Sequence, residues 1–92
     1  MVKTFRHKGL QAFYETGSKA GIQPHHAVRL RRQLVRLDLA KTSVDMNVPG
    51  WGLHTLAGNL AGRYAVSVSG NWRLTFGFDG EDAVLADYQD YH

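Results

Sequence analysis

Residues 70–78, Gly-Asn-Trp-Arg-Leu-Thr-Phe-Gly-Phe, and residues 83–92, Ala-Val-Leu-Ala-Asp-Tyr-Gln-Asp-Tyr-His, decide the fold of this chain. In the first stretch, apolar side chains alternate with small or polar ones, which places the aromatic residues on one face and Arg73 on the other. This period of two predicts a half-buried strand. The Asp-Gly pair at residues 79–80 favours a tight turn, so the second stretch should return antiparallel to the first.

The end of the second stretch concentrates reactive side chains. Asp90, Tyr91 and His92 follow one another beside a strand that displays Arg73, so an acid, a base and a cation are expected at one place. Strand alternation cannot turn both tyrosines inward, and we expect Tyr88 to be the buried one.

The N-terminal half predicts a short strand followed by two helices. Residues 2–5 are prone to form a strand. From His7 onward, apolar residues recur every three or four positions, which predicts a first helix that ends at Gly17, a residue suited to a C-cap. A second helix is predicted over residues 24–40, because Pro24 suits a first helical turn and the apolar period continues beyond it.

The second predicted helix has two distinct faces. Four apolar residues at helical spacing form the stripe expected to be buried: Ala27, Leu30, Leu34 and Leu37. Four basic residues at spacings of four, three and four share another face: His25, Arg29, Arg32 and Arg36. This row is either a solvated helix face or a ridge that contacts phosphates, and both interpretations remain open.

The C-terminal half predicts an antiparallel meander. After a loop over residues 41–50, residues 51–56 have an extended pattern, and residues 57–62 read as a hairpin loop before a strand over residues 63–69. We therefore predict an α+β fold: an N-terminal strand, two helices and a three- to four-stranded antiparallel sheet, with the helices on one face. By alternation, the uncovered sheet face should carry four polar residues: His54, Arg63, Ser67 and Arg73.

Composition limits the classes of function. Ninety-two residues suit one domain, which favours a surface site over a deep pocket between domains. The formal net charge of +3 and a pI near 9.5 favour a polyanionic partner. The absence of cysteine excludes disulfides, thiol nucleophiles and zinc-thiolate sites. No secretory signal or membrane-spanning run is recognisable, so we expect a cytoplasmic protein that does not associate with membranes.

Three motifs together resemble a known family. They are Leu-His-Thr-Leu-x-Gly at residues 53–58, Asn-Trp-Arg-Leu-Thr-Phe at residues 71–76 and Asp-Tyr-Gln-Asp-Tyr-His at residues 87–92, with Lys-x-Phe-x-His-Lys-Gly-Leu at residues 3–10 adding to them. The chain closely resembles the HigB branch of the RelE/ParE toxin superfamily along nearly its whole length. The resemblance implies a RelE-like fold and a ribosome-dependent endonuclease that cuts messenger RNA in the decoding site. It also implies a helix-turn-helix antitoxin of the HigA kind.

Such an enzyme needs no metal or other cofactor, because RNA supplies its own nucleophile, the ribose 2′-hydroxyl. The protein must supply a base, a cation for the phosphate and an acid for the leaving 5′-oxygen. Histidine suits either proton transfer. We expect His92 to perform one of them, as the resemblance also implies, although a last residue can equally be a frayed end. His54 is the second candidate, for proton transfer or substrate orientation, or it is an ordinary exposed histidine. Which of the two is the acid is left open.

Four further residues complete the candidate site. Asp90 could position His92 or act as a base, and Tyr91 could stack on a nucleobase, bond the scissile phosphate or pack in the core. Arg73 is the best phosphate clamp, because a guanidinium can grip two oxygens, although a cross-strand salt bridge would also explain it. Asn71 could read a nucleobase edge or simply occupy a turn.

Two positions depart from the family pattern. Ala57 stands where lysine is frequent, and Thr55 where proline is usual. The loss of a cation near the phosphate should weaken substrate binding or catalysis, and Arg63 could partly compensate.

Two functions from other classes compete with the nuclease. One is a ParE-like protein that uses the same fold to bind a topoisomerase without chemistry; clustered proton-transfer groups argue against it. The other is a non-catalytic module that docks on ribosomal RNA through Arg29, Arg32 and Arg36.

Overall fold

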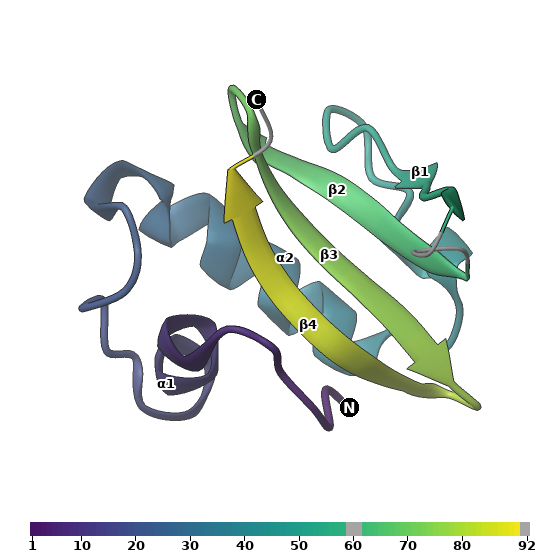
Figure 1. Ribbon diagram of the computed structural model, residues 1–92, viewed down its shortest axis with the longest axis horizontal. Coiled ribbons are helices and arrows are strands. Elements are labelled where there is room, and N and C mark those ends of the chain that lie inside the picture. Colours follow the sequence, from purple (N-terminus) through teal and green to yellow (C-terminus); the bar gives the residue numbers. More distant parts are fainter. Residues whose placement is uncertain (59–61, 91–92) are drawn as a thin grey trace.

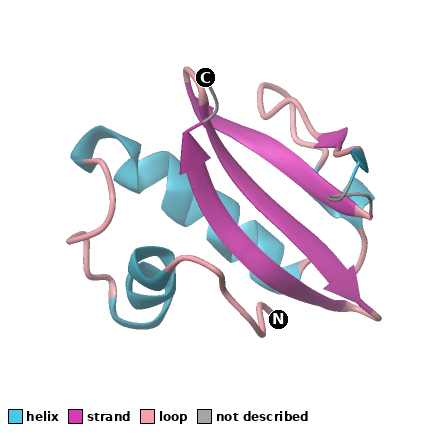
Figure 2. Cartoon of the chain, in the orientation of Figure 1, coloured by secondary structure: helices cyan, strands magenta, loops and turns pink. Residues whose placement is uncertain are grey.

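The chain folds into one layer of helices packed on one face of an antiparallel sheet (Figures 1 and 2). This computed structural model describes residues 1–58 and 62–90. The four strands lie in the order in which they follow along the chain: β1 (His54–Thr55), β2 (Arg63–Ser69), β3 (Trp72–Asp79) and β4 (Asp82–Asp90). In the described ranges, the helical elements are α1 (Lys8–Thr16), the 3-10 turn η1 (Pro24–His26), α2 (Ala27–Leu39) and the 3-10 turn η2 (Ser43–Met46). The α+β prediction is confirmed.

The core lies between α2 and the sheet. All four residues of the predicted helix stripe are buried: Ala27, Leu30, Leu34 and Leu37. They pack with the apolar side chains of β2 and β3, of which Leu74 and Phe76 are fully buried. Each such large side chain contributes about 1.5–3 kcal/mol when it leaves water. Tyr88 of β4 is buried as predicted.

The helix ends follow the sequence signals. The Nδ1 atom of His7 accepts a hydrogen bond of 2.9 Å from the Leu10 amide and so caps α1. Gly17 ends this helix in the left-handed conformation, with φ of 79°. The predicted second helix begins as the 3-10 turn at Pro24 and continues as α2. No helix in the described part of the chain combines the length and apolar character needed to cross a membrane.

The N-terminal segment differs from the regular strand that was predicted. It runs parallel to β4 and forms two isolated bridges, between Val2 and Ala83 and between Phe5 and Ala86. The cause lies in β4, where Leu85 has a left-handed backbone with φ of 56°. Its amide donates to the Thr4 hydroxyl at 2.8 Å instead of to a backbone carbonyl, which interrupts the ladder.

β1 is shorter than the extended run predicted over residues 51–56. Only His54 and Thr55 form regular pairs with β2, and the Leu56 amide adds a hydrogen bond of 2.9 Å to the Arg63 carbonyl, so regular pairing along the outer edge of β2 stops short of Ser67. Other groups occupy that edge at Ser67: its amide donates to the Trp51 carbonyl at 2.7 Å. Its carbonyl accepts hydrogen bonds from Gln33 Nε2 at 2.8 Å and from Arg29 Nε at 3.2 Å. These bonds fasten α2 to the sheet.

A buried histidine joins η1 to the end of β4. His26 is 2% exposed, and its Nδ1 lies 2.5 Å from the Tyr88 hydroxyl. The same hydroxyl accepts a hydrogen bond from the Gln23 amide at 3.3 Å, so its own proton is directed to Nδ1. The Trp72 ring stacks on Tyr88 with centroids 4.5 Å apart. Burial, with repulsion from His25, holds the pKa of His26 below its ordinary value.

The first turn of α1 lies against the following loop through two glycines. A Cβ atom added at Gly9 would lie 2.9 Å from the Gly21 Cα, and one added at Gly21 would lie 2.8 Å from the Gly9 Cα. No L side chain fits this contact without a backbone shift. Gly77 of β3 differs, because a Cβ there would meet its nearest neighbour, Arg63 Cγ, at an ordinary 3.5 Å.

We predict that Gly9→Ala destabilises the protein by about 1–3 kcal/mol, although alanine is the better helix former, because the added methyl overpacks a backbone contact. Gly77→Ala is the matched control and should be neutral or slightly stabilising. Urea unfolding measures both changes. Equal or greater stability of the Gly9 variant would contradict the contact.

We also predict that His26 makes stability sensitive to mild acid. The unfolded chain protonates this residue near pH 6.5 and the folded chain only at lower pH. Its contribution is therefore complete above about pH 6.5 and is lost as the pH falls from there toward the folded pKa. Between pH 8 and pH 5, the free energy of unfolding should fall more in the wild type than in His26→Gln. The other histidines are present in both proteins, so parallel curves would refute the prediction.

Candidate functional site

The sheet face that the helices leave uncovered carries the polar residues that alternation predicted. One row of paired residues crosses all four strands: His54, Ala65, Thr75 and Asp87. A second row lies one pleat nearer the β2–β3 turn: Ser67, Arg73 and Gln89. His54, Ser67 and Arg73 are therefore brought to one face, as expected from the sequence.

Arg73 lies on this face beside the β2–β3 turn, on the inner strand β3, and is anchored by one nitrogen. Its Nη1 donates to the Gly70 carbonyl at 2.8 Å, to the Trp72 carbonyl at 3.2 Å and to Ser67 Oγ at 3.5 Å. Toward the described residues, Nη2 and Nε form no hydrogen bonds, so this edge of the guanidinium remains able to grip an anion. The cross-strand salt bridge considered from the sequence is not formed with any described residue.

His54 is exposed, and its orientation is fixed by its own loop. Its Nδ1 lies 2.9 Å from the Gly52 carbonyl. Because a carbonyl only accepts, Nδ1 carries the proton and donates it. In the neutral ring, the lone pair then belongs to Nε2, on the other side of the imidazole. This tautomer is the one that a general base at Nε2 requires.

Three polar residues of this face were not singled out from the sequence. Thr75 and Asp87 are paired across β3 and β4, and both are buried although no helix covers them. The Asp87 carboxylate accepts hydrogen bonds from the Tyr88 amide at 2.9 Å and from Gln89 Nε2 at 2.8 Å. Extending the alternation of Arg73 along β3 and across to β4 would have found all three.

Asp90 ends β4 at the rim of the sheet. It pairs with Trp72, so alternation directs its side chain toward Trp72 and Tyr88 rather than toward Arg73. Burial raises the pKa of Tyr88, and the charge of Asp90 adds to this rise, which agrees with that direction. β1 and β4 are the outer strands, so three spacings of about 4.8 Å, on the order of 14 Å, separate His54 from β4. His54 and Asp90 are therefore not in contact. The roles predicted for Tyr91 and His92 fall outside the described residues.

Arg63 lies on the uncovered face but serves the sheet. Its side chain crosses over Gly77, and its Nη2 donates to the Leu85 carbonyl at 3.1 Å. Four residues of extended chain, about 13 Å, separate it from Ser67 in the row of Arg73. To replace the lysine that the family has at position 57, Arg63 would have to break its hydrogen bond to the Leu85 carbonyl. Compensation by Arg63 therefore stays a prediction.

The basic ridge of α2 is partly used by the fold. Besides Ser67, Arg29 binds the Gly50 carbonyl at 2.8 Å, and Arg36 Nε donates to the Asp45 carbonyl at 2.8 Å. Arg32 is exposed and forms no ion pair or hydrogen bond with the described residues. Only Arg32 of the three arginines is therefore wholly available to a partner.

Asn71 occupies the two-residue turn between β2 and β3, where the preceding Gly70 has a φ of 55°. Its side chain is exposed, so a turn role and a contact with substrate are compatible. Thr55 and Ala57 depart from the family pattern. Both are exposed at the edge of the sheet that β1 forms, Thr55 within β1 and Ala57 just after it.

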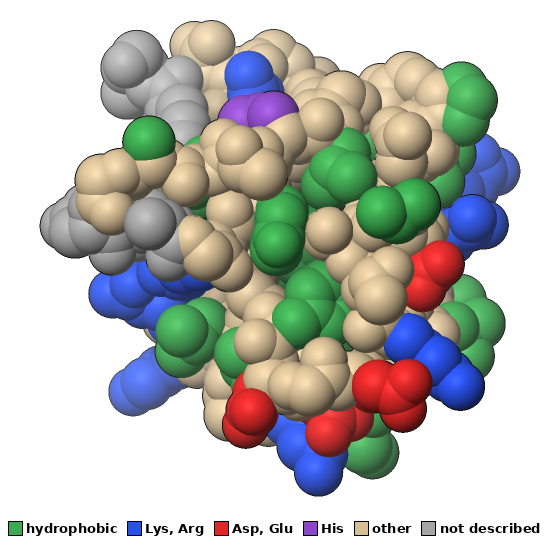
Figure 3. All heavy atoms as spheres, turned by 90° about the vertical axis from the view of Figure 1, so that its right-hand side faces the viewer, with side chains coloured by type: hydrophobic (Ala, Val, Ile, Leu, Met, Phe, Trp, Pro, Cys, Tyr) green, Lys and Arg blue, Asp and Glu red, His purple; other side chains and the backbone are tan. Residues whose placement is uncertain are grey.

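Acidic side chains are concentrated at one end of the side of the molecule that carries β1. In Figure 3, histidine atoms lie near Lys or Arg atoms at the top of this view, and acidic side chains gather at its lower edge, where Lys and Arg side chains lie beside them. The lower edge corresponds to the end where β3 turns into β4, whose turn contains Asp79, Glu81 and Asp82 (Figure 1).

Comparison with known proteins adds a family to this geometry. A sequence model of the HigB-like toxins, described as the RelE-like toxin of the type II toxin–antitoxin system HigB, matches residues 3–92. The chain is also 36% identical to the protein named endoribonuclease HigB of Proteus vulgaris, over 92 residues that span the whole of both chains. The protein therefore belongs to the HigB-like family of RelE-like toxins from type II toxin–antitoxin systems.

Proposed function

We propose that this toxin is a ribosome-dependent endoribonuclease that cuts messenger RNA in the decoding site and so inhibits translation in the cytoplasm. Full-length similarity to a protein named endoribonuclease HigB supports the activity. The observation that carries the proposal for the site is the uncovered sheet face, where Arg73 has an available guanidinium edge and His54 has a defined tautomer. A type II toxin has an antitoxin partner, which we propose to be a HigA-like helix-turn-helix protein.

The proposed reaction is attack of the ribose 2′-hydroxyl on the adjacent phosphate. Of His54 and His92, one removes the proton of the 2′-hydroxyl and the other donates a proton to the leaving 5′-oxygen. Arg73 stabilises the charge that develops on the phosphate oxygens. Asp90 positions His92 or acts as a base itself, and Tyr91 stacks on a nucleobase or hydrogen-bonds the scissile phosphate. Asn71, at the turn beside Arg73, is the proposed contact to a nucleobase. The RNA supplies the nucleophile and two histidines transfer the protons, so the proposed reaction needs no cofactor.

The spread of these groups supports dependence on the ribosome. A separation on the order of 14 Å between His54 and β4 leaves the face open and wide. Free RNA would have to adopt the reactive geometry on this face unaided, which costs much of the advantage of an enzyme site. A strand already bent and held by the ribosome would meet the groups in place.

We predict that His54→Ala and His92→Ala each lower cleavage of translated messenger RNA by roughly 10²–10⁴-fold, the usual contribution of one acid or base. Lys19→Ala, an exposed cation on the loop after α1, is the control and should cleave as the wild type does. Primer extension on purified ribosomes with a defined message gives the rates. Translation arrest without cleavage would instead favour a ribosome-binding module, and relaxed plasmid without cleavage would favour a topoisomerase inhibitor.

A second prediction concerns the ridge. Arg29 and Arg36 donate hydrogen bonds to backbone carbonyls, so replacing either would change the stability of the fold as well as ribosome binding. Arg32→Ala should leave the fold unchanged. Arg32→Ala should weaken association with ribosomes and reduce its dependence on salt, because one phosphate contact is lost. Sedimentation with 70S ribosomes at several salt concentrations measures both effects. Identical salt slopes would return Arg32 to the solvated surface.

A further inference from the structure

α2 carries an apolar stripe on the side that faces away from the sheet. Val28, Val35 and Leu39 are 66%, 57% and 77% exposed. Their spacing of seven and four residues returns to the same line along a helix, opposite the buried stripe. Three large apolar side chains in one exposed row are unusual on a basic helix and mark a surface that a partner covers.

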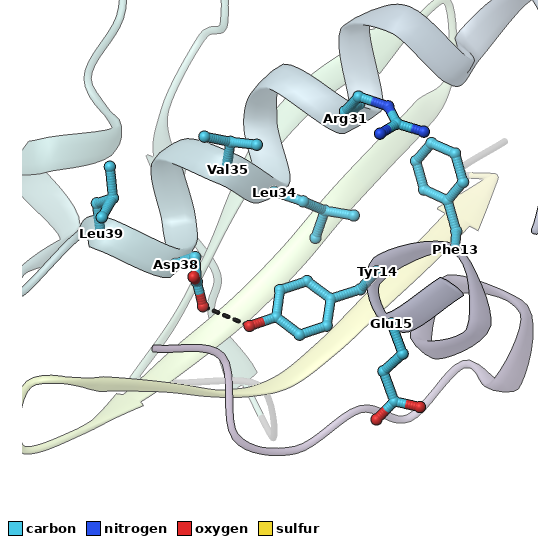
Figure 4. A pocket seen from close by; sticks show the side chains of 8 residues that line it. All are labelled: Phe13, Tyr14, Glu15, Arg31, Leu34, Val35, Asp38 and Leu39. Atoms are coloured by element: carbon cyan, nitrogen blue, oxygen red, sulfur yellow. Dashed lines mark hydrogen bonds between the residues drawn. The ribbon is translucent and has the colours of Figure 1, made fainter. Parts of the chain in front are cut away.

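The stripe forms one wall of a groove between α1 and α2 (Figure 4). The groove has a volume of about 530 Å³, and Val35 and Leu39 of the stripe line it together with Phe13 and Leu34. At its floor, the Tyr14 hydroxyl donates to the Asp38 carboxylate, which also accepts a hydrogen bond of 3.0 Å from the Val2 amide. The Asp38 charge is therefore already engaged, and these bonds hold its pKa below the ordinary value.

The exposed charges of α2 beside the stripe are positive, whereas α1 contributes one exposed acidic residue to the groove, Glu15, whose carboxylate points away from α2 in Figure 4. Arg31 lies on the groove side, with its guanidinium carbon 5.4 Å from the centre of the Phe13 ring. Arg32 lies on the other side by helical spacing and is exposed. A partner that fits this surface needs apolar side chains for the groove and carboxylates beside Arg31 and Arg32 of α2. This is the pattern of an acidic amphipathic helix.

We propose that the α1–α2 groove is the surface on which the antitoxin docks, through an acidic amphipathic helix whose apolar side chains enter the groove between Phe13 and Leu39. This proposal rests on the proposed function for the identity of the partner, an antitoxin. It adds the surface of the toxin to which that partner binds. A second copy of this chain fits poorly, because it would bring the same arginines against Arg31 and Arg32. An RNA fits poorly too, because phosphates gain nothing from three exposed apolar side chains.

The placement has a consequence for inhibition. α2, which lines the groove, packs on the sheet face opposite the uncovered one (Figure 1), and Arg32 lies on the same helix, across the stripe from the groove. A docked antitoxin would thus cover the available cation of the ridge and compete with ribosomal phosphates at that residue.

The test measures the affinity of the purified antitoxin for full-length toxin variants by calorimetry. Val35→Gln and Leu39→Gln remove apolar surface without adding charge, and their exposure means that the core is unchanged. Each should weaken binding by about 10-fold or more, as expected for side chains buried at an interface centre. Val44→Gln is the matched control, an apolar residue of η2 that is 72% exposed and outside the stripe, and it should bind within about 2-fold of the wild type.

The charge part of the proposal has its own variant. Arg31→Gln should lower the affinity for the antitoxin and flatten its dependence on salt, because one charge pair at the groove is removed. Messenger RNA cleavage by the same preparations should match the wild type, since neither Arg31 nor the stripe belongs to the sheet face. Methyl signals of Val35 and Leu39 should shift when antitoxin is added.

Two outcomes would overturn the docking proposal: wild-type affinity in both glutamine variants, or a toxin that is dimeric alone and becomes monomeric with Leu39→Gln. The failure of the proposed function would look different. In that case wild-type toxin would not cut translated messenger RNA, while the affinities for the antitoxin would still show whether the groove is used.

Discussion

The peptide group of Ser67 is the point on which the arrangement of this molecule depends. β1 is too short to pair with this part of β2, so the edge would present unpaired groups at the position where the site is built. Trp51, Arg29 and Gln33 satisfy it from a loop and from α2, and the hydroxyl of the same residue contacts Arg73 on the opposite side. One residue thus ties the helix layer, the edge of the sheet and the proposed phosphate clamp together.

This construction explains why one face of the sheet can remain open. The helix layer and the Trp72–Tyr88–His26 cluster fix the strands from behind, so His54 and Arg73 in front are positioned without being enclosed. An open face suits a substrate that is presented by a larger particle, because access matters more than enclosure. The basic helix and its apolar stripe remain on the other layer, where a protein partner can approach without entering the site.

Alternation and helical spacing predicted most of what is local: the α+β class, the α2 stripe, the burial of Tyr88 and the facing of His54, Ser67 and Arg73. The failures arise where contacts between distant segments decide. The left-handed Leu85 prevents a regular N-terminal strand, and the Ser67 carbonyl converts Arg29 from a surface cation into a structural one. Alternation from the buried Tyr88 places Asp90 on the helix-facing side of β4, but the sequence did not show that Trp72 is its neighbour, since that depends on the register between β3 and β4.

The pairing of the N-terminal segment with β4 has a consequence for biosynthesis. Thr4 and Leu85, which contact each other, are 81 residues apart in the sequence. At about 5–20 residues per second, a ribosome needs roughly 4–16 s to add the strand that the first residues require. Until then, α1 and α2 have no complete sheet to cover. The sheet that carries the site is therefore incomplete until β4 has been synthesised, and the delay gives other molecules time to meet the unfinished chain.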